Sequence, residues 1–422
     1  MEIFRAPIGT HDVLPPDSAW WEQALGSFAQ LARRAGYGLL LSPLFEDVAV
    51  FDRGIGATSD VATKEMYVFE DRGGRRLALR PEGTASVVRA FVQHHPVVPW
   101  KVWYATPAFR YERPQAGRYR QHHQVGVEAL GSPDPALDVE VIALAARFYE
   151  ALGLRRVRLL INSMGHPECR QAYVAVLAAY LGEHADELCD EHRTRFADSP
   201  LRVLDCKRPE CVAVTEHGPQ LPDHLCAACH EHFAAVRSGL DSIAIPWSLA
   251  PRLVRGFDYY TRTTFEFVSD ALAAAQNAVG GGGRYDGLAE QLGGPATAGV
   301  GFGSGLERLR LAWEAEGLRG EVDPVDAFVV DTTGGAHATV LADRLRQAGL
   351  VVERAFGQRS MKAQMRLADR SGAAVAVLVG PTEAAQGSVT IRDLRGAAEG
   401  AQVTVPASEL VATVRERVTE RR

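Results

Sequence analysis

The order of strand-like and helix-like segments constrains this chain more than any other feature. Between residues 38 and 130, most strand-like runs follow one another without an intervening helix. Consecutive strands of this kind pair antiparallel, whereas a doubly wound parallel sheet needs a helix between its strands. After residue 326 the pattern changes to strand, helix, strand, helix. The sequence therefore predicts two different sheets in separate domains.

The individual runs predict an α+β first domain, a mainly antiparallel sheet flanked by helices. A helix is expected at 17–36, where Asp17 and Ser18 are suitable caps and Gly36 is a stop signal. Further helices are expected at 84–94, 138–153 and 305–316. The expected strands are 38–41, 66–70, 76–79, 101–106, 108–112, 124–129, 157–162, 263–268 and 300–303.

Residues 168–245 differ from their neighbours. They are rich in Ala, Glu and His, have a mostly helical pattern, and contain all six cysteines of the chain. We interpret them as an insertion that divides the first domain into 1–167 and 246–318. A polar linker with Gly and Pro, 317–324, leads to an α/β module at 325–422 of typical domain size.

Composition excludes several classes of protein. Hydrophobic residues make up 46% and charged residues 23%, as in ordinary globular proteins. With a net charge of -6, any RNA contact must come from local basic patches. No apolar run reaches the roughly eighteen residues of a membrane span, and the first residues lack the apolar core of a signal peptide. A cytoplasmic protein with reduced thiols is expected.

Three arginines occupy settings that suit phosphate binding. Arg110 lies in FRYERPQ, Arg255 in LVRGFDYY and Arg308 in GFGSGLERL, each near glycine or aromatic residues. A guanidinium is permanently charged, and its fork matches phosphate and carboxylate oxygens. Nucleotidyl transfer needs such charges around the pentavalent phosphorus. A surface salt bridge is the alternative for each arginine taken singly.

The segment from Arg110 to Gln124 is basic and contains interleaved aromatic residues, with Glu112 as its one acid. This pattern is typical of a loop that contacts phosphates and bases. A solvated basic hairpin tip is an equally good interpretation of the segment alone.

The glycine run Gly280–Gly283 matches neither a P-loop nor a dinucleotide-binding fingerprint, because no Lys follows it and the flanking elements do not fit. We expect these glycines to lie where the backbone approaches a ligand closely.

Four cysteines have the spacing of metal ligands. Cys206 and Cys211 are five apart, and Cys226 and Cys229 form CAAC. Together the four predict a tetrahedral structural zinc site. The alternative is a set of buried or incidental thiols in a variable insertion. Four histidines in the same region are substitute ligands: His217, His224, His230 and His232. The two cysteines expected to be ordinary thiols are Cys169 and Cys189.

Taken in order, these segments resemble the motifs of the class II aminoacyl-tRNA synthetases, and specifically the histidyl-tRNA synthetase family. The strand that enters Arg110 and Glu112 resembles motif 2, and GVGFGSGLERL, with Arg308, resembles motif 3. PIGTHDVLPPDS is similar to the amino-terminal signature, and LRPEGTASVVRA to the amino-acid-binding segment. LVRGFDYYTRTTFEF and GGRYDGL resemble two peptides peculiar to the family. FGQRSMKAQMRLADRSGA is similar to its anticodon-binding domain, so the resemblance covers essentially the whole chain.

The resemblance implies a set of histidine-binding residues. Glu82 and Thr84 bind the α-amino group in this reading, Gln124 holds the carboxylate side, and Glu128 and Tyr260 read the imidazole nitrogens. A neutral imidazole has one donor and one acceptor, so a pocket that bonds both nitrogens rejects apolar isosteres. The implied histidine-binding residues are Glu82, Thr84, Gln124, Glu128, Tyr259 and Tyr260.

It also implies how ATP and Mg²⁺ are held. Arg110 binds the α-phosphate, and Arg255 acts from the opposite side, where other class II enzymes place a metal. Arg308 holds the ATP tail. Glu112 positions the adenine and helps to bind a magnesium ion. His122 stands where the family usually has a phenylalanine under the adenine, and an imidazole is a weaker stacking platform.

The implied reaction joins L-histidine to tRNA(His) through a histidyl-adenylate, with release of AMP and diphosphate. Gln115 and Arg118 meet the acceptor end of the RNA, and the family implies a homodimer. One alternative is a catalytically silent, synthetase-like regulatory subunit of ATP phosphoribosyltransferase, and another is a nucleic-acid-binding protein that no longer catalyses. The three arginines and the presence of residues 325–422 favour the enzyme over the regulatory subunit.

Overall fold

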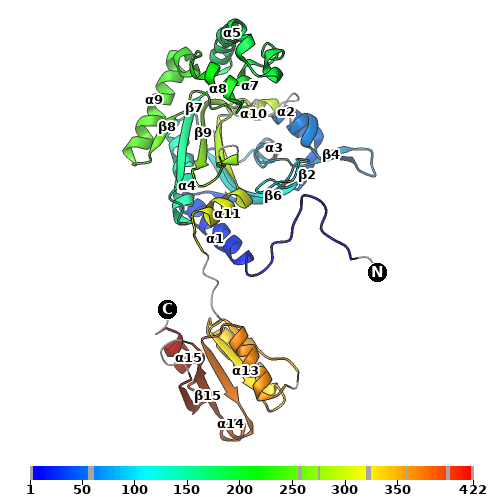
Figure 1. The fold of residues 1–422 in the computed structure, drawn as a ribbon, viewed down its shortest axis with the longest axis vertical. Helices are drawn as coiled ribbons and strands as arrows, with labels where there is room; N and C mark the ends of the chain where they lie inside the picture. Colours follow the sequence, from blue (N-terminus) through cyan, green and yellow to red (C-terminus); the bar gives the residue numbers. More distant parts are fainter. Residues whose placement is uncertain are drawn as a thin grey trace. The chain divides into compact units, whose positions relative to one another are not determined.

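The structure, a computed structural model, describes residues 3–55, 61–254, 259–273, 276–319, 325–357, 359–395 and 400–419. The chain forms two compact units, residues 1–319 and 320–422 (Figure 1). Within the described residues, no helix combines the length and the apolar character needed to cross a membrane.

An eight-stranded sheet forms the centre of the first unit, in the order β1-β5-β6-β11-β10-β9-β7-β8. The six central strands pair antiparallel, whereas each edge strand pairs parallel with its neighbour. The predicted sheet is therefore confirmed, with two parallel edges. Its strands are β1 (Gly38–Leu39), β5 (Trp100–Phe109), β6 (Gln121–Leu130), β7 (Val157–Ser163), β8 (Trp247–Leu249), β9 (Thr261–Ser269), β10 (Ala278–Arg284) and β11 (Gly299–Gly305).

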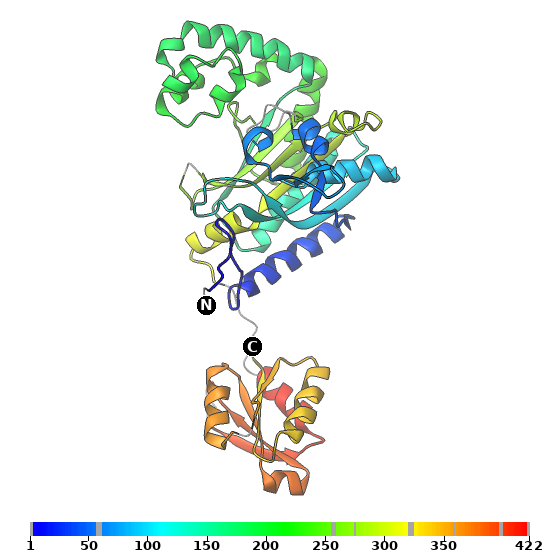
Figure 2. The ribbon, with the colours of Figure 1, turned by 90° about the vertical axis from the view of Figure 1, so that its right-hand side faces the viewer.

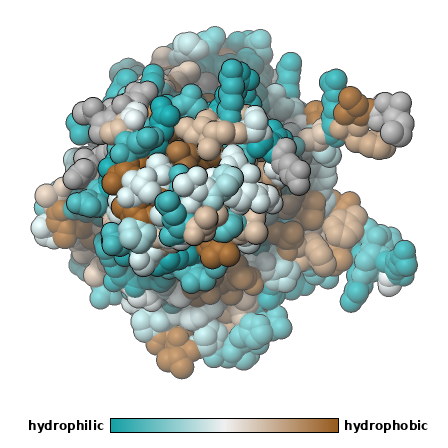
Figure 3. All heavy atoms as spheres, turned by 90° about the horizontal axis from the view of Figure 1, so that it is seen from below, coloured by the Kyte–Doolittle hydropathy of each residue, from teal (hydrophilic) through white to brown (hydrophobic). Residues whose placement is uncertain are grey.

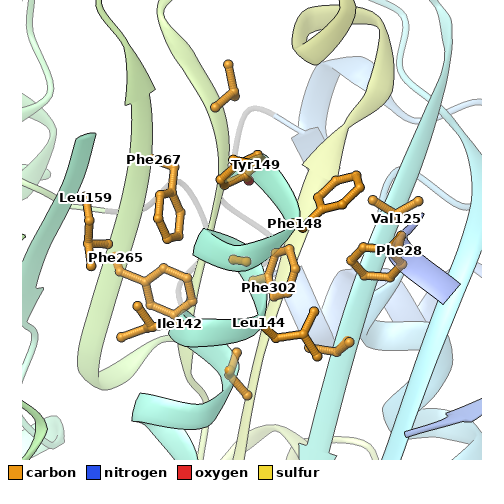
Figure 4. Close-up of a cluster of buried hydrophobic side chains, with 14 of the residues drawn as sticks. Phe28, Val125, Ile142, Leu144, Phe148, Tyr149, Leu159, Phe265, Phe267 and Phe302 are labelled. Carbon is orange, nitrogen blue, oxygen red and sulfur yellow. The ribbon is translucent and has the colours of Figure 1, made fainter. Parts of the chain in front are cut away.

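One face of this sheet packs against three helices, α1 (Ser18–Arg34), α4 (Pro135–Ala151) and α11 (Leu306–Ala315). Figure 4 shows the core between them, where Phe28 of α1, Phe148 of α4 and Phe302 of β11 meet. The ring centroids of Phe28 and Phe148 are 5.0 Å apart. Burial of these aromatic rings is the main force that holds the helical layer on the sheet.

The opposite face carries a small sheet and three short helices (Figure 2). The small sheet has the order β2-β4-β3. Its strands are β2 (Phe45–Asp47), β3 (Val68–Glu70) and β4 (Arg76–Leu79), and the helices are α2 (Val48–Ile55), α3 (Thr84–His94) and α10 (Leu288–Gln291). A π-helical turn, η1 (Val61–Glu65), precedes β3. Apolar residues of α3 and α10 pack with Tyr104 and Leu130 of the large sheet.

A mostly helical region lies between β7 and β8. Its elements are α5 (Pro167–Glu183), η2 (Ala185–Glu187), α6 (Asp190–Arg193), α7 (Pro200–Leu204), α8 (Pro209–Glu216), η3 (Leu221–His224) and α9 (Ala227–Ser242). The region has a core of its own around Tyr173 and Leu177, while α9 contributes Phe233 to the core of the sheet. It therefore folds around two cores at once.

A buried ion pair beside α9 joins α4 to the sheet. The guanidinium of Arg284, at the end of β10, bonds the carboxylate of Asp138 on α4, and both side chains are fully buried. His232 of α9 lies beside them, with its Nε2 3.7 Å from an Asp138 oxygen. Burial lowers the pKa of His232 to about 4, so this imidazole is neutral at pH 7.

The second unit is an α/β module with a five-stranded sheet in the order β13-β12-β14-β15-β16. β13, β12 and β14 run parallel, and β15 and β16 are antiparallel to their neighbours. Its elements are β12 (Ala327–Asp331), α12 (Ala336–Gln347), β13 (Val352–Arg354), α13 (Met361–Arg370), β14 (Val375–Val379), α14 (Pro381–Gln386), β15 (Ser388–Asp393), β16 (Gln402–Pro406) and α15 (Leu410–Thr419). On the face of the molecule seen in Figure 3, hydrophobic side chains lie scattered among hydrophilic ones.

Three sequence predictions about elements differ from the structure. The strands expected at 101–106 and 108–112 are one strand, β5, which pairs with β6 through Pro107 as far as Phe109. Asp17 makes no capping bond at α1, because its carboxylate pairs with Arg310 at 3.0 Å. The glycines at 280–283 belong to a strand, β10, which the low strand propensity of glycine concealed.

Candidate active site

Side-chain alternation along β6 and β11 creates a polar face on the large sheet. In β6, Val125 and Val127 point into the helical core, so Gln124 and Glu128 lie on the other face. The register sets Gln124 opposite Gly305 and Glu128 opposite Gly301. Each of these polar side chains therefore faces a residue without a side chain, which leaves room above the strands.

The space above these strands contains a cavity of about 240 Å³, here called the sheet cavity. Three guanidinium groups line it, those of Arg110, Arg118 and Arg308. Arg110 Nε donates to the Pro81 carbonyl at 2.9 Å, and Arg308 Nη1 donates to the Ala278 carbonyl at 2.9 Å. The lining residues are Arg110, Glu112, Gly117, Arg118, Tyr119, His122, Gln124, Glu266, Ala278, Val279, Gly280, Gly281, Gly303, Gly305, Glu307 and Arg308.

His122 lies in the sheet cavity as a neutral ring. Burial lowers the pKa of its imidazole to about 3, and the positive charges of Arg110 and Arg308 act in the same direction. Because the ring carries no charge at pH 7, it adds no repulsion to these cations. It supplies a flat surface in the cavity.

Glu307 fixes the first turn of α11, which carries Arg308. Its carboxylate accepts from the backbone N–H of His123 at 3.0 Å and lies 2.8 Å from Nδ1 of the same imidazole. This contact ties α11 to β6 and so sets the direction of the neighbouring Arg308. The sequence pattern indicates no role for Glu307 or His123, although they adjoin Arg308 and His122.

Glu128 is the centre of a second group, here called the glutamate pocket (Glu128, Thr84, Tyr104 and Tyr285). The Thr84 hydroxyl donates to Glu128 Oε1 at 2.7 Å, Tyr104 lies 3.4 Å from the same oxygen, and the Tyr285 hydroxyl donates to Oε2. Burial raises the pKa of Glu128 to about 8, against the opposing effect of these hydroxyl donors. Tyr104 and Tyr285 were not predicted, although Tyr285 lies in the quoted motif GGRYDGL.

Glu82 holds the start of α3 next to the glutamate pocket. Its carboxylate accepts from the backbone N–H of Thr84 at 2.6 Å and of Ala85 at 2.8 Å. Burial raises the pKa of Glu82, while these N–H donors and the charge of Arg110 lower it. An acid at this position also suits the positive end of the helix dipole.

Tyr259 and Tyr260 are buried beside the glutamate pocket, with ring centroids 4.6 Å apart. The Tyr260 ring passes so close to Gly283 that a Cβ there would come within 2.9 Å of it. Gly283 therefore allows the close approach of a tyrosine ring, and the approach of a ligand to these glycines stays a prediction. Arg255, the third predicted arginine, lies outside the described residues.

The loop between β5 and β6 bends back at a β-bridge between Gln115 and Arg118. Both residues are exposed, and Arg118 Nη1 lies 3.4 Å from a Glu112 oxygen. Farther along the loop, the Arg120 guanidinium stacks over the Tyr111 ring at 3.9 Å. The loop thus presents arginines at its tip and at the rim of the sheet cavity.

The predicted zinc ligand set is wrong. The structure divides its four cysteines between two groups rather than one, because helices α8 and α9 bring each pair to a different partner segment. The first cluster is His166, Cys169, Cys226 and Cys229, and the second cluster is Cys189, His192, Cys206 and Cys211. Cys169 and Cys189, which the sequence predicts to be ordinary thiols, each lie in one of these clusters. None of the four proposed substitute histidines is a member of either cluster.

Comparison with known proteins gives two family matches. The model of histidyl-tRNA synthetase matches residues 9–309, and the model of an anticodon binding domain matches residues 327–417. Among curated relatives, a histidine–tRNA ligase from Mycobacterium marinum is 49% identical over 417 residues, which cover 97% of this chain and 98% of the relative. One from Rhodococcus erythropolis is 49% identical over 416 residues, 97% of this chain and 96% of the relative.

Solved structures agree with these matches. The apo histidyl-tRNA synthetase of S. aureus superposes with a TM-score of 0.81 at 33% identity, over 98% of this chain and 100% of that one. A Bacillus halodurans protein described as an ATP phosphoribosyltransferase regulatory subunit/histidyl-tRNA synthetase superposes with a TM-score of 0.64 at 21% identity, over 87% and 97%. At that identity the second likeness concerns the fold alone.

Proposed function

Because the chain belongs to the histidyl-tRNA synthetase family, we propose that it attaches L-histidine to tRNA(His) in an ATP-dependent reaction. The observation that carries this proposal is the convergence of Arg110, Arg118 and Arg308 on one cavity. A buried carboxylate, Glu128, lies on the same strand as the Gln124 that lines this cavity. Phosphate and imidazole recognition thus share one sheet face.

Histidine binds over the glutamate pocket in this proposal. Glu128 and Tyr260 bond the two imidazole nitrogens, with Tyr259 packed behind them. Glu82 and Thr84 receive the α-amino group, and Gln124 faces the carboxylate. The support is chemical, because a buried carboxyl whose pKa is near neutrality can either donate to or accept from an imidazole nitrogen.

ATP occupies the sheet cavity. Arg110 binds the α-phosphate, Arg308 the phosphate tail, and His122 stacks on the adenine as a neutral ring. Arg255 acts on the transition state from the other side of the phosphorus. The guanidinium forks match phosphate oxygens, and their burial strengthens the attraction.

Magnesium fits the same cavity, since the carboxylates of Glu112 and Glu266 both line it and Mg²⁺ prefers oxygen ligands. Glu112 is the residue that we assign to the ion. When bound, the ion neutralises phosphate charge.

The reaction proceeds in two steps. A histidine carboxylate oxygen attacks the α-phosphorus, a new P–O bond forms, and diphosphate leaves with the electrons of the broken bond. A terminal ribose hydroxyl of the tRNA then attacks the activated carbonyl, loses its proton and releases AMP. Neither step needs a side-chain nucleophile, so positioning and electrostatic stabilisation supply the rate.

The RNA contacts fall on two regions. Gln115 and Arg118 meet the acceptor end, because they lie exposed at the tip of the loop beside the cavity. Residues 325–422 read the anticodon. We divide the remainder into a catalytic domain, 1–167 and 246–318, and an insertion, 168–245. A homodimer with an interface at the amino-terminal motif region completes the proposal.

Histidine-dependent exchange of diphosphate into ATP, followed by charging of a tRNA(His) transcript, tests this function. We expect both activities in the wild-type chain, and a regulatory subunit of ATP phosphoribosyltransferase would have neither. Arg308→Ala should lower exchange roughly 100-fold, because a phosphate contact is lost, and Arg255→Ala should abolish it. Arg310→Ala is the matched control on α11, since Arg310 pairs with Asp17 away from the cavity. Near-normal exchange in Arg308→Ala would contradict the assignment.

A further inference from the structure

All six cysteines of the chain enter two clusters of the same composition, three cysteines and one histidine each. Within each cluster, one ligand atom from every residue lies within 4.8 Å of the others. Neither cluster takes part in the proposed reaction. We propose that the helical region between β7 and β8 binds two structural zinc ions, one in each cluster.

The observed distances match those of a tetrahedral zinc site. With Zn–S of about 2.3 Å and Zn–N of about 2.0–2.1 Å, sulfur and nitrogen ligands are roughly 3.5–3.6 Å apart. In the second cluster, His192 Nδ1 lies 3.2 Å from Cys189 Sγ and 3.7 Å from Cys211 Sγ. One nitrogen therefore faces two sulfurs at the spacing that a shared ion requires.

In the first cluster the imidazole of His166 lies between two sulfurs. Its Nδ1 is 3.4 Å from Cys169 Sγ, and its Nε2 is 3.4 Å from Cys226 Sγ. The fourth member, Cys229, is fully buried. One ligand atom from each of the four side chains lies within 4.8 Å of the others. Three sulfurs and one imidazole nitrogen are soft and borderline ligands, a set that selects zinc over magnesium or calcium.

Sequence spacing supports the same ligand sets. The first cluster combines His-x2-Cys at 166–169 with Cys-x2-Cys at 226–229, and the second combines Cys-x2-His at 189–192 with Cys-x4-Cys at 206–211. Two close pairs from separate segments are the usual construction of a structural zinc site. Four protein ligands also close the coordination sphere, which excludes a catalytic role for the ion.

The clusters lie where helices begin. His166, Cys189 and Cys226 directly precede α5, α6 and α9, and none of them makes a side-chain capping bond. Instead, backbone N–H groups point at sulfur: that of Cys226 lies 3.3 Å from Cys169 Sγ, and that of Cys189 lies 3.4 Å from Cys211 Sγ. Such N–H donors stabilise thiolates, the form that binds a metal.

Disulfides explain the clusters less well. Each cluster holds three thiols, so one disulfide would leave an odd cysteine and an unused imidazole in both. The core of this region is also small, and small cores commonly depend on a metal or another cross-link for stability. One zinc ion in each cluster would use all eight side chains of the two clusters as ligands.

Metal analysis of the full-length chain, purified without chelators, tests the proposal. We expect two zinc ions per chain, one in Cys169→Ser, one in Cys189→Ser and none in the double variant, because the two ligand sets are separate. His230→Ala is the control, since its exposed imidazole lies next to Cys229 but outside both clusters. Fewer than two ions in the wild-type chain would overturn the two-site proposal. A single variant that keeps its circular dichroism spectrum and both ions would overturn the ligand assignment.

A second measurement separates metal loss from misfolding. Serine is a better helix N-cap than cysteine, so Cys226→Ser should raise the melting temperature if no metal is bound and lower it if one is. We expect a lower melting temperature, and a chelator should lower that of the wild-type chain more than that of the variant. A rise would overturn the proposal. The intact mass of the chain, measured after denaturation and alkylation without reductant, should show six alkylated thiols. A mass that shows any disulfide would also overturn the proposal.

Discussion

The glutamate pocket and the two cysteine clusters both gather polar side chains inside the protein, but they use different elements. The pocket grows from long strands, where alternation and register decide which side chains share a face. The clusters form where separate helices begin, and the relative positions of these helices depend on tertiary packing. Residues of the pocket can therefore be read from contiguous motifs, whereas contacts between separate helices cannot.

The two regions also differ in how they stabilise a buried polar group. In the glutamate pocket, hydroxyl donors surround Glu128, and burial keeps the pKa of its carboxyl high. In the clusters, the described residues place no hydroxyl network around the sulfurs, and on our proposal a metal cation supplies the compensation. The Arg284–Asp138 pair provides a third solution, a direct ion pair with both side chains buried.

The largest effect is expected at this ion pair. Arg284→Met should reduce the free energy of unfolding by about 3–5 kcal/mol, because Asp138 is then left charged and buried without its partner. The matched control is Arg158→Met, whose pair with Asp270 is exposed and should contribute at most about 1 kcal/mol. Urea unfolding measures both. Equal losses would show that burial does not distinguish the two pairs.

Gly301→Ala should come next and should act on catalysis. A Cβ at this position would overlap a carboxylate oxygen of Glu128 and approach the Val127 carbonyl to 2.6 Å. We expect kcat/KM for histidine, measured by diphosphate exchange, to fall about 100-fold as the glutamate is displaced. Gly287→Ala serves as the control, because its Cβ would meet nothing within 4 Å. A near-normal value in Gly301→Ala would remove Glu128 from the histidine pocket.

Glu128→Gln tests the raised pKa of the buried carboxyl through the pH dependence of the free energy of unfolding. The pKa of Glu128 is raised from 4.5 to about 8, so the folded chain binds the proton more tightly than the unfolded chain. Stability from this group is thus complete below pH 4.5 and is lost as pH rises toward 8. Relative to the Gln variant, the wild-type chain should lose about 1.4 kcal/mol per pH unit across that window. A pH-independent difference between the two unfolding curves would contradict the raised pKa.

The smallest expected effect is the loss of stability when the residue directly before α4 or α9 is replaced. Asp134 caps α4 by accepting from the Ala136 N–H at 2.9 Å. Asp134→Ala should cost about 1 kcal/mol, and this loss should be the same with and without a chelator. The loss caused by Cys226→Ser should instead shrink when a chelator is present. Chelator dependence of both losses, or of neither, would remove the distinction between the regions.

Much of the sheet site could be predicted from the sequence, because its residues lie in contiguous motifs on strands or directly beyond their ends. Arg110, His122 and Arg308 were selected in this way, and the structure places them around one cavity. Tyr104 was missed, since its ring reaches Glu128 from a neighbouring strand and nothing in the local pattern of β5 indicates that contact.

The cysteine clusters could be predicted only in part from the sequence. Sequence spacing correctly identified Cys206 with Cys211, and Cys226 with Cys229, as pairs. It could not identify the partner of each pair, because only the packing of α5 to α9 brings Cys189 or Cys169 into place. His192 and His166 had no signal beyond a spacing of three residues from a cysteine.

With histidine bound over the glutamate pocket, as we propose, the bare backbone opposite Glu128 limits redesign of the substrate range. Main-chain atoms of β11 form that wall, with Gly301 directly across from the acid. Because this wall has no side chain that a substitution could shorten, no substitution in it can make room for an amino acid larger than histidine. Extra width has to come from residues such as Thr84 or Tyr285, which also hold Glu128 in place. Broadened specificity and loss of the recognition group are therefore coupled in this fold.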